Sequence, residues 1–311
     1  MPRIIFQLII LVSAILLSSC QESPSDHSRK QSEPPLNQEK INPSDYFKNK
    51  LLEKPIHFLL LGVDSRGEEE SRADSIMLVQ YSAENRTIKV VSVMRDSFVE
   101  IPGYKHDYGK INQSYFLGGE KLLKDTLETN FNVSIDYTIT IDFDGFATVI
   151  DKVVPDGIDV EVSPEMIEDM NFDMEPGENT LHGEDLLKFV RFRHDDNSDF
   201  GRVERQQEIL LQLKNEVNEK INSIHGVTEL PNIADTVMKN IKTDLSVGQL
   251  FTLSSNIFLK PVEDIQTMRL PVTDGYTNKQ DSHAGSVLEI DLPKNQQVLS
   301  EFLSDTVPVN E

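Results

Sequence analysis

The chain has 311 residues, a formal net charge of -22 and a single cysteine. The strong acidity argues against binding to nucleic acid, and one cysteine excludes an intramolecular disulfide. The length is enough for one sizeable folded domain.

An export signal is predicted at residues 1–20. Arg3 is followed by an apolar run over residues 4–17, which is shorter than the ~20 residues that a membrane-spanning helix needs. Residues 17–20 read LSSC and resemble the bacterial lipobox, in which the cysteine, here Cys20, receives the lipid. The alternative is an uncleaved signal anchor that holds the protein as a short membrane helix. Both versions predict a protein on the extracytoplasmic face of the cell membrane.

A flexible linker is predicted at residues 21–54, because this stretch is polar and interrupted by four prolines. Such a tether lets the folded part move over the membrane. The globular part is predicted at residues 55–305, with its core motifs at 56–222 and a C-terminal part at 223–305.

Strands and helices are predicted to alternate through the globular part. Continuous apolar runs such as HFLLLGV are typical of strands that are covered on both faces. We expect strands at residues 57–63, 76–81, 87–94 and 137–141, and helices at residues 118–130, 143–153, 184–190, 202–221 and 245–258. This order predicts an α/β fold, as a single layered domain with a central mixed β-sheet flanked by helices.

An acidic residue and an arginine occur together at the ends of the first three predicted strands. These pairs are Asp64 with Arg66, Arg72 with Asp74, and Arg95 with Asp96. Proteins of the α/β class tend to bind ligands at strand ends. Asp64 and Asp74 are candidate ligands for Mg²⁺, or Mn²⁺ in its place, because magnesium needs only one or two carboxylates beside substrate phosphates. Arginines beside such a carboxylate pair favour phosphoryl transfer, because they stabilise the oxygens that gain negative charge. The alternative is that these residues only terminate strands and cap turns.

Residues 190–207, which read VRFRHDDNSDFGRVERQQ, concentrate arginine in an acidic chain and indicate an anion-binding site. Two groups share a face: Arg191 and Arg193 in an extended segment, and Arg202, Arg205 and Gln206 on a helix. A turn at residues 199–201 is expected to open that helix, whose free amides would face the anion. The alternative is a set of ordinary surface ion pairs with nearby aspartates.

Standard nucleotide and zinc motifs are missing from the sequence. It contains no GxxxxGK[ST], no GxGxxG and no HExxH pattern. Nucleotide-driven kinases, dinucleotide oxidoreductases and zinc proteases are therefore disfavoured. The energy for any group transfer must come with the substrate.

Five motifs in order resemble the LytR-CpsA-Psr family. They are LLLGVDSR at 59–66, RADS at 72–75, SVMRDSFVEIPGY at 92–104, KINQSY at 110–115, and VRFR with DFGRVERQQ within 190–207. The similarity runs from about residue 52 to residue 302. The sequence departs from the family pattern at Ala73, Met94 and Gln113, where a small hydroxyl residue, proline and histidine are usual, and no departure removes a charged group.

The resemblance implies an extracytoplasmic phosphotransferase of cell wall assembly, a glycopolymer–peptidoglycan ligase. Family members move an anionic glycopolymer, such as wall teichoic acid, from an undecaprenyl-pyrophosphate-type carrier to peptidoglycan, and an N-terminal anchor holds them at the membrane. The family's magnesium ligands correspond to Asp64 and Asp74, and we expect catalytic roles for these two residues, Arg95 and Asp96. The pyrophosphate-binding set is Arg66, Arg72, Arg95, Arg191, Arg193, Arg202, Arg205 and Gln206.

Two other functions use the same residues. A polyprenyl pyrophosphate hydrolase would use the same metal and arginine site with water as the acceptor. A non-catalytic lipoprotein would bind anionic glycolipids or act as a regulator without turnover. A prenyl chain would also need an apolar groove, for which Phe116, Leu117, Phe143, Phe146 and the apolar face of residues 209–213 are candidates.

Overall fold

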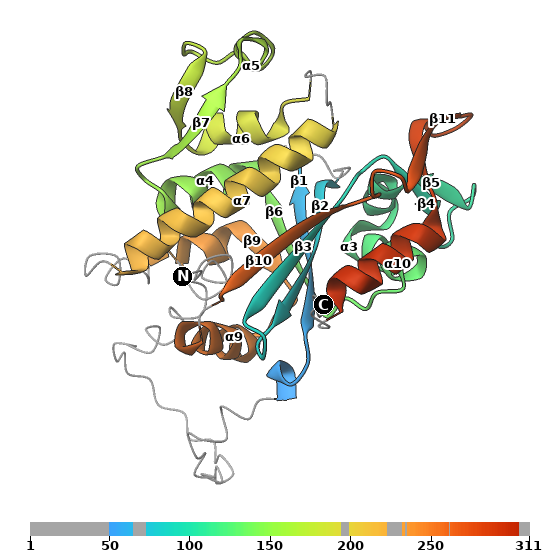
Figure 1. Ribbon diagram of the computed structural model, residues 1–311, viewed down its shortest axis with the longest axis horizontal. Helices are drawn as coiled ribbons and strands as arrows, with labels where there is room; N and C mark the ends of the chain where they lie inside the picture. The colour runs from blue at the N-terminus through green and yellow to red at the C-terminus, as the bar shows by residue number, and fades with distance from the viewer. Residues whose placement is uncertain are drawn as a thin grey trace, which may run out of the picture.

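The computed structural model describes residues 50–64, 73–193, 199–222, 232–233, 235–260 and 262–304 (Figure 1). The predicted export signal with Cys20, most of the linker, and the site candidates Arg66 and Arg72 lie outside the described residues. Among the described helices, none is long and apolar enough to cross a membrane.

A mixed six-stranded sheet forms the centre of the fold, in the order β10-β3-β2-β1-β6-β9. Its strands are β1 (Ile56–Val63), β2 (Ala73–Ser82), β3 (Thr87–Val93), β6 (Tyr137–Asp142), β9 (Ile241–Thr243) and β10 (Asp264–Leu270). β2 is antiparallel to both β1 and β3, whereas β6 runs parallel to β1 and β10 parallel to β3. The predicted central mixed sheet is thus confirmed.

Helices cover both faces of this sheet, as Figure 1 shows. One face packs on α3 (Ile111–Phe131) and α10 (Leu292–Leu303); the other packs on α4 (Phe143–Val153), α6 (Gly183–Arg191), α7 (Asp199–Asn222) and α9 (Val247–Leu259). Successive β1 residues alternate between the two cores, so that Phe58 faces α4 and α6 while Leu59 faces α3. Both residues are fully buried, which explains why the strand reads as a continuous apolar run.

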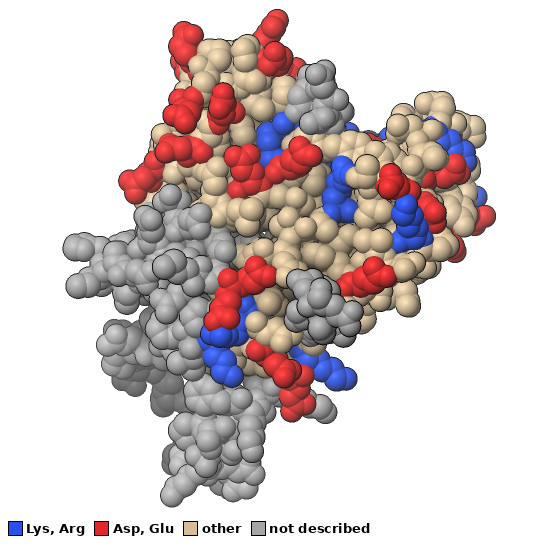
Figure 2. Space-filling view, viewed as in Figure 1, with Lys and Arg blue, Asp and Glu red and all other residues tan. Residues whose placement is uncertain are grey.

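Two smaller sheets extend the fold. The four-stranded sheet has the order β11-β12-β4-β5, and β7 pairs with β8 as a hairpin. The strands of these two sheets are β4 (Ser97–Glu100), β5 (Tyr108–Lys110), β7 (Ile158–Val162), β8 (Gly177–Leu181), β11 (Tyr276–Asp281) and β12 (Gly285–Ile290). A short helix, α5 (Pro164–Met170), joins β7 to β8. A 3-10 helix, η2 (Lys50–Leu52), precedes β1. Figure 2 shows acidic side chains crowding the surface over α5 and the β7–β8 hairpin.

The predicted helix boundaries agree with the structure to different degrees. α4 begins and ends at the predicted residues. Its start is fixed by Asp142, whose carboxylate caps the helix by accepting a hydrogen bond from the Gly145 N–H at 2.7 Å. α3 begins seven residues earlier than expected, at Ile111 instead of residue 118, with a kink where Gly119 adopts φ 64°. Residues 199–201, predicted as a turn, form the first turn of α7.

Asn295 fixes α10 to the segment between β10 and β11. Its fully buried amide donates to Gly275 O at 2.7 Å and Asp291 O at 2.8 Å, and its Oδ1 accepts from the Val272 N–H at 2.9 Å. We predict that Asn295→Ala lowers the free energy of unfolding by about 2–4 kcal/mol, because buried backbone groups lose their partner. Chemical denaturation measures this loss.

Gln297→Ala on the same helix is the matched control. Gln297 is exposed and its amide bonds to the exposed Glu301. Its substitution is expected to change the unfolding free energy by less than about 0.5 kcal/mol. Equal effects of the two substitutions would show that the Asn295 network does not stabilise the fold.

Candidate active site

A β-bulge places Asp74 at the edge of the central sheet. Gly62 pairs with Ser75 and Val63 with Ala73, which leaves Asp74 as the extra residue of β2. If the side chains of β2 alternated regularly, Asp74 would point to the same side as Ile76 and Leu78, into the apolar core under α3. Because of the bulge, the fully buried Ala73 occupies that position instead. The Asp74 carboxylate consequently remains partly exposed.

The Asp74 carboxylate contacts two arginines from distant parts of the chain. Its Oδ1 lies 2.9 Å from Arg95 Nη1 and 3.4 Å from Arg193 Nη2. Arg95 stands in the turn between β3 and β4, which is fixed by hydrogen bonds from Met94 N to Leu270 O at 2.8 Å and from Ser97 N to Met94 O at 3.0 Å. Two arginines of the predicted pyrophosphate-binding set therefore meet at one candidate metal ligand.

Asp96 continues the same charge cluster. Its Oδ2 lies 3.6 Å from Arg95 Nε, and its Oδ1 lies 2.6 Å from Lys110 Nζ at the end of β5. Lys110 was missed as a site residue by the sequence prediction, although it opens the KINQSY motif. The pairing of β4 with β5 brings it beside Asp96.

Arg191 reaches the second candidate metal ligand. It is the last residue of α6, and its guanidinium lies 4.0 Å from the Phe143 ring centroid while Nη2 lies 3.7 Å from Asp64 Oδ2. Phe192 between the two arginines is fully buried, so Arg191 and Arg193 extend away from the core. The expected extended segment is in fact a helix end, and both arginines still reach the aspartates.

The assembled cluster has an excess of positive charge. It contains the cations Arg95, Lys110, Arg191 and Arg193 and the carboxylates Asp64, Asp74 and Asp96, a formal balance of +4 and -3. All these side chains are between 23% and 34% exposed, so a ligand can reach them. A net positive site in a chain of charge -22 selects for an anion.

Arg205 and Gln206 on α7 hold the arginine segment in place. The buried Arg205 donates from Nη2 to Phe192 O, and Gln206 donates from Nε2 to Val190 O at 3.3 Å. Gln206 also accepts a hydrogen bond from Ser75 Oγ at 3.3 Å, which links α7 to the bulge. Arg202 is 2% exposed. Pyrophosphate binding by these three residues stays a prediction, and the geometry gives Arg205 and Gln206 a positioning role.

Arg269 adds a cation that the sequence prediction did not include. It pairs with Ser92 across β10 and β3, and its guanidinium lies 4.2 Å from the Phe200 ring centroid. Burial lowers the pKa of Arg269, with Tyr276 and Glu204 acting in the opposite direction. Because β10 is parallel to β3, Arg269 lies at the same edge of the sheet as Arg95.

Asp64 and Asp74 are chemically suited to a hard divalent cation. They supply carboxylate oxygens from adjacent strands, since Asp64 follows Val63 and Val63 pairs with Ala73. No cluster of three or more histidine, cysteine or acidic side chains that could hold a metal occurs within the described part of the chain. This donor set fits magnesium, which completes its coordination with water and phosphate oxygens.

The fold and site define an α/β protein with a charge cluster of net positive charge at the ends of strands β1, β2 and β3 of a mixed sheet. The model of the LytR_cpsA_psr family matches residues 16–300, and the chain belongs to this family. It is 36% identical over 251 residues to the regulatory protein MsrR of Staphylococcus aureus (strain Mu50), covering 80% of this chain and 75% of MsrR. It is also 36% identical over 216 residues to the polyisoprenyl-teichoic acid–peptidoglycan teichoic acid transferase TagU of Bacillus anthracis (strain CDC 684), covering 68% of this chain and 69% of TagU.

A solved structure of TagT bound to LI-WTA has a similar fold. The TM-score is 0.63 at 27% identity, and the alignment covers 80% of this chain and 90% of TagT. The expected family and fold are thereby confirmed.

Arg205 and Arg193 are predicted to differ in their effect on stability. Arg205→Ala should lower the free energy of unfolding by about 1–3 kcal/mol, because the carbonyl of buried Phe192 loses its donor. Arg193→Ala should lower it by less than about 1 kcal/mol, because its pair with Asp74 is solvent-accessible. Denaturant titration of both variants tests this, and a larger loss for Arg193→Ala would contradict the assigned roles.

Proposed function

We propose that this protein is a phosphotransferase that attaches an anionic glycopolymer to peptidoglycan from a polyprenyl-pyrophosphate carrier at the extracytoplasmic membrane face. The observation that carries the proposal is the sharing of Asp74 by Arg95 and Arg193 beside Asp64 and Arg191. The relationship to TagU, a teichoic acid transferase by name, and to TagT, which was solved with LI-WTA, supports the same chemistry.

The name of MsrR favours regulation as a second candidate function. Regulation by direct DNA binding is disfavoured by the net charge of -22 and by the acidic surface over α5 and β7–β8 (Figure 2). A regulator that acts through bound glycolipid would use the same cluster without turnover. The transfer assay described below separates the two functions.

In the proposed reaction, a hydroxyl oxygen of a peptidoglycan sugar attacks the phosphorus that carries the polymer. A new O–P bond forms, the bond from that phosphorus to the bridging oxygen breaks, and polyprenyl phosphate leaves with the electron pair. Arg95 and Arg193 neutralise the negative charge that grows on the phosphate oxygens. Asp96 is assigned to take the hydroxyl proton, because it is the carboxylate of the cluster that would not hold the metal.

Magnesium would be held by Asp64 and Asp74. When bound, it supplies Lewis-acid stabilisation of the diphosphate oxygens. Metal binding to Asp74 would draw this carboxylate away from Arg95 and Arg193. Both guanidinium groups could then donate hydrogen bonds to the phosphates, for which their planar geometry is well suited.

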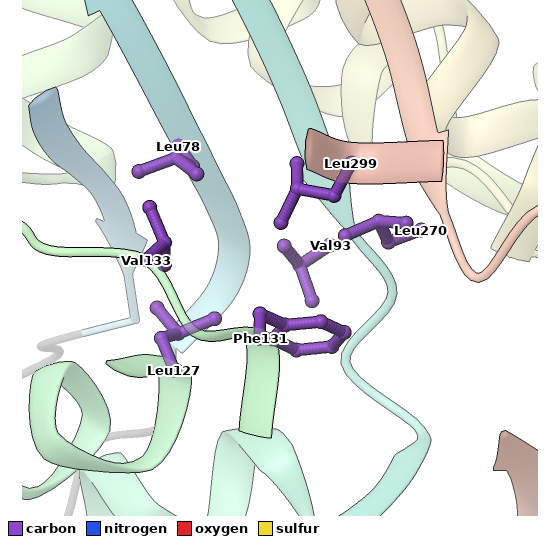
Figure 3. A pocket seen from close by; sticks show the side chains of 7 residues that line it. All are labelled: Leu78, Val93, Leu127, Phe131, Val133, Leu270 and Leu299. Atoms are coloured by element: carbon purple, nitrogen blue, oxygen red, sulfur yellow. The ribbon is translucent and has the colours of Figure 1, made fainter. Parts of the chain in front are cut away.

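A small apolar gap lies between the central sheet, α3 and α10, and Figure 3 shows the side chains that surround it. The lining residues are Leu78, Val93, Leu127, Phe131, Val133, Leu270 and Leu299. They line the buried core and leave no space for a water molecule, so the prenyl chain is not assigned to this gap. Of the groove candidates from the sequence, Phe116 and Leu117 are 37% and 43% exposed, whereas Ile209 is buried in the opposite core.

Asp74→Ala and Arg95→Ala are predicted to abolish polymer attachment. Loss of a metal ligand or of a cation that stabilises the transition state should lower the transfer rate by about 10²–10³-fold or more. The assay incubates the protein with magnesium, a synthetic lipid-linked polymer precursor and nascent peptidoglycan, and quantifies the covalent product. Chelation of the metal should have a similar effect.

Arg86→Ala and Asp235→Ala are the matched controls for this assay. Arg86 lies in the turn between β2 and β3 and forms an ion pair with Glu263, which precedes β10. Asp235 forms an ion pair with Lys239 on the surface. Both should retain wild-type transfer. Normal attachment by Asp74→Ala would refute the proposed function, and release of the polymer without attachment would favour a hydrolase.

A further inference from the structure

Five ring side chains form a connected cluster on the small sheet, which we call the ring platform. Its members are Phe98, Tyr104, His106, Tyr108 and His283. They come from the β4–β5 hairpin and from the β11–β12 turn, which are far apart in the sequence. In Figure 1, β4, β5 and β11 lie together at one end of the molecule, beside α10.

The rings are in direct contact with each other. His106 stacks on His283 with 4.4 Å between ring centroids and 18° between planes, and Tyr108 stacks on Phe98 with centroids 5.8 Å apart. Tyr104 contacts the His106 ring edge-on at 5.2 Å. The His283 ring is fixed on both sides, by Asp281 Oδ1 at 2.8 Å from Nδ1 and by Tyr108 O at 2.8 Å from Nε2.

The platform faces solvent although its rings are largely apolar. Tyr108 is 48% exposed, the largest value among the exposed large hydrophobic residues of the described chain, and His106 is exposed as well. The His283 side chain is 25% exposed, and Phe98 and Tyr104 are half-buried. Aromatic rings that remain in water forgo the stabilisation that burial would provide. A contiguous, partly exposed set of rings held in fixed orientations indicates a binding surface.

The platform is continuous with the charge cluster of the active site. Phe98 pairs with Lys110 across β4 and β5, so both side chains lie on one face of the sheet. Tyr108 is two residues before Lys110 in β5 and shares that face. Because Lys110 Nζ contacts Asp96 at 2.6 Å, a ligand on the platform would lie next to the proposed proton acceptor.

The charge around the platform disfavours the polyanionic donor as its ligand. The neighbouring carboxylates are Glu100, Asp107, Asp281 and Glu289, against the ammonium groups of Lys105, Lys110 and Lys279. The N–H groups of Ala284 and His283 lower the pKa of Asp281, which keeps this carboxylate ionised. Carboxylates repel a polymer of phosphates but accept hydrogen bonds from sugar hydroxyl groups.

We propose that the ring platform binds the glycan strand of the acceptor and delivers a sugar hydroxyl to the charge cluster. This inference rests on the proposed function, and it assigns the acceptor to the side of the site formed by the small sheet. The C–H faces of pyranose rings pack on the exposed aromatic and imidazole rings, while the surrounding carboxylates bind hydroxyl groups. The diphosphate would bind at Arg95 and Arg193 in the charge cluster.

The test titrates the protein with a soluble β-1,4-linked oligosaccharide of alternating N-acetylglucosamine and N-acetylmuramic acid, in which the lactyl carboxyl groups are in amide linkage and carry no charge. Binding is followed by calorimetry for the wild type and for Tyr108→Ala, His106→Ala and Tyr108→Phe. We expect about tenfold weaker binding for each alanine variant, and near wild-type binding for Tyr108→Phe, because its ring is retained. The exposed His182, the N-cap residue that precedes α6, provides the matched control His182→Ala, which should bind normally.

Two further measurements separate this inference from the proposed function. Asp74→Ala should bind the oligosaccharide like the wild type although it transfers no polymer, and the platform variants should keep their affinity for inorganic pyrophosphate. If Tyr108→Ala and His106→Ala bind the oligosaccharide as the wild type does, the platform does not bind the acceptor glycan. The same conclusion follows if these residues bind phospholipid vesicles and not the oligosaccharide. If the wild type binds the oligosaccharide through the platform but transfers no polymer, only the proposed function is overturned.

Discussion

The carboxylate of Asp74 holds the candidate site together, because one of its oxygens neutralises two guanidinium groups that would otherwise repel each other. Arg95 approaches it from the turn after β3 and Arg193 from the end of the α6 segment. The same carboxylate is a candidate metal ligand. A bound cation would compete with both arginines for Asp74, and their freed donors would be directed at the anion that accompanies the metal. Metal and diphosphate binding would therefore be mutually supportive.

The rest of the structure fixes the positions of these groups. Strands β1, β2 and β3 are buried on both faces, so their ends cannot shift without disturbing two cores at once. The bulge in β2 directs Asp74 outward, and Gln206 connects that bulge to the backbone of α6. Lys110 then links the cluster to the small sheet and its exposed rings. In the proposed function, the acceptor would therefore approach the charge cluster from the side of the small sheet.

The sequence was most informative where burial alone determines structure. Strands β1, β2, β3 and β6 and helix α4 were predicted because apolar runs and helical spacing are local signals. Strands β4, β5 and β7 to β12 were missed; β4, β5 and β9 have only three or four residues, too few to show a periodicity. The motifs predicted that Arg95, Arg191 and Arg193 belong to one pyrophosphate-binding set, whereas their contacts with aspartates are known only from the structure. The bulge, the role of Lys110 and the backbone contacts of Arg205 depend on pairing between distant segments, which a local pattern does not contain.

The most direct measurement of the central claim is a crystal structure of the described domain with a short-chain prenyl diphosphate and Mn²⁺. The account predicts anomalous scattering from a metal ion on Asp64 and Asp74, with the diphosphate oxygens bound by Arg95 and Arg193, both displaced from Asp74. A diphosphate bound away from this cluster, or a metal held by other residues while both arginines remain on Asp74, would contradict it.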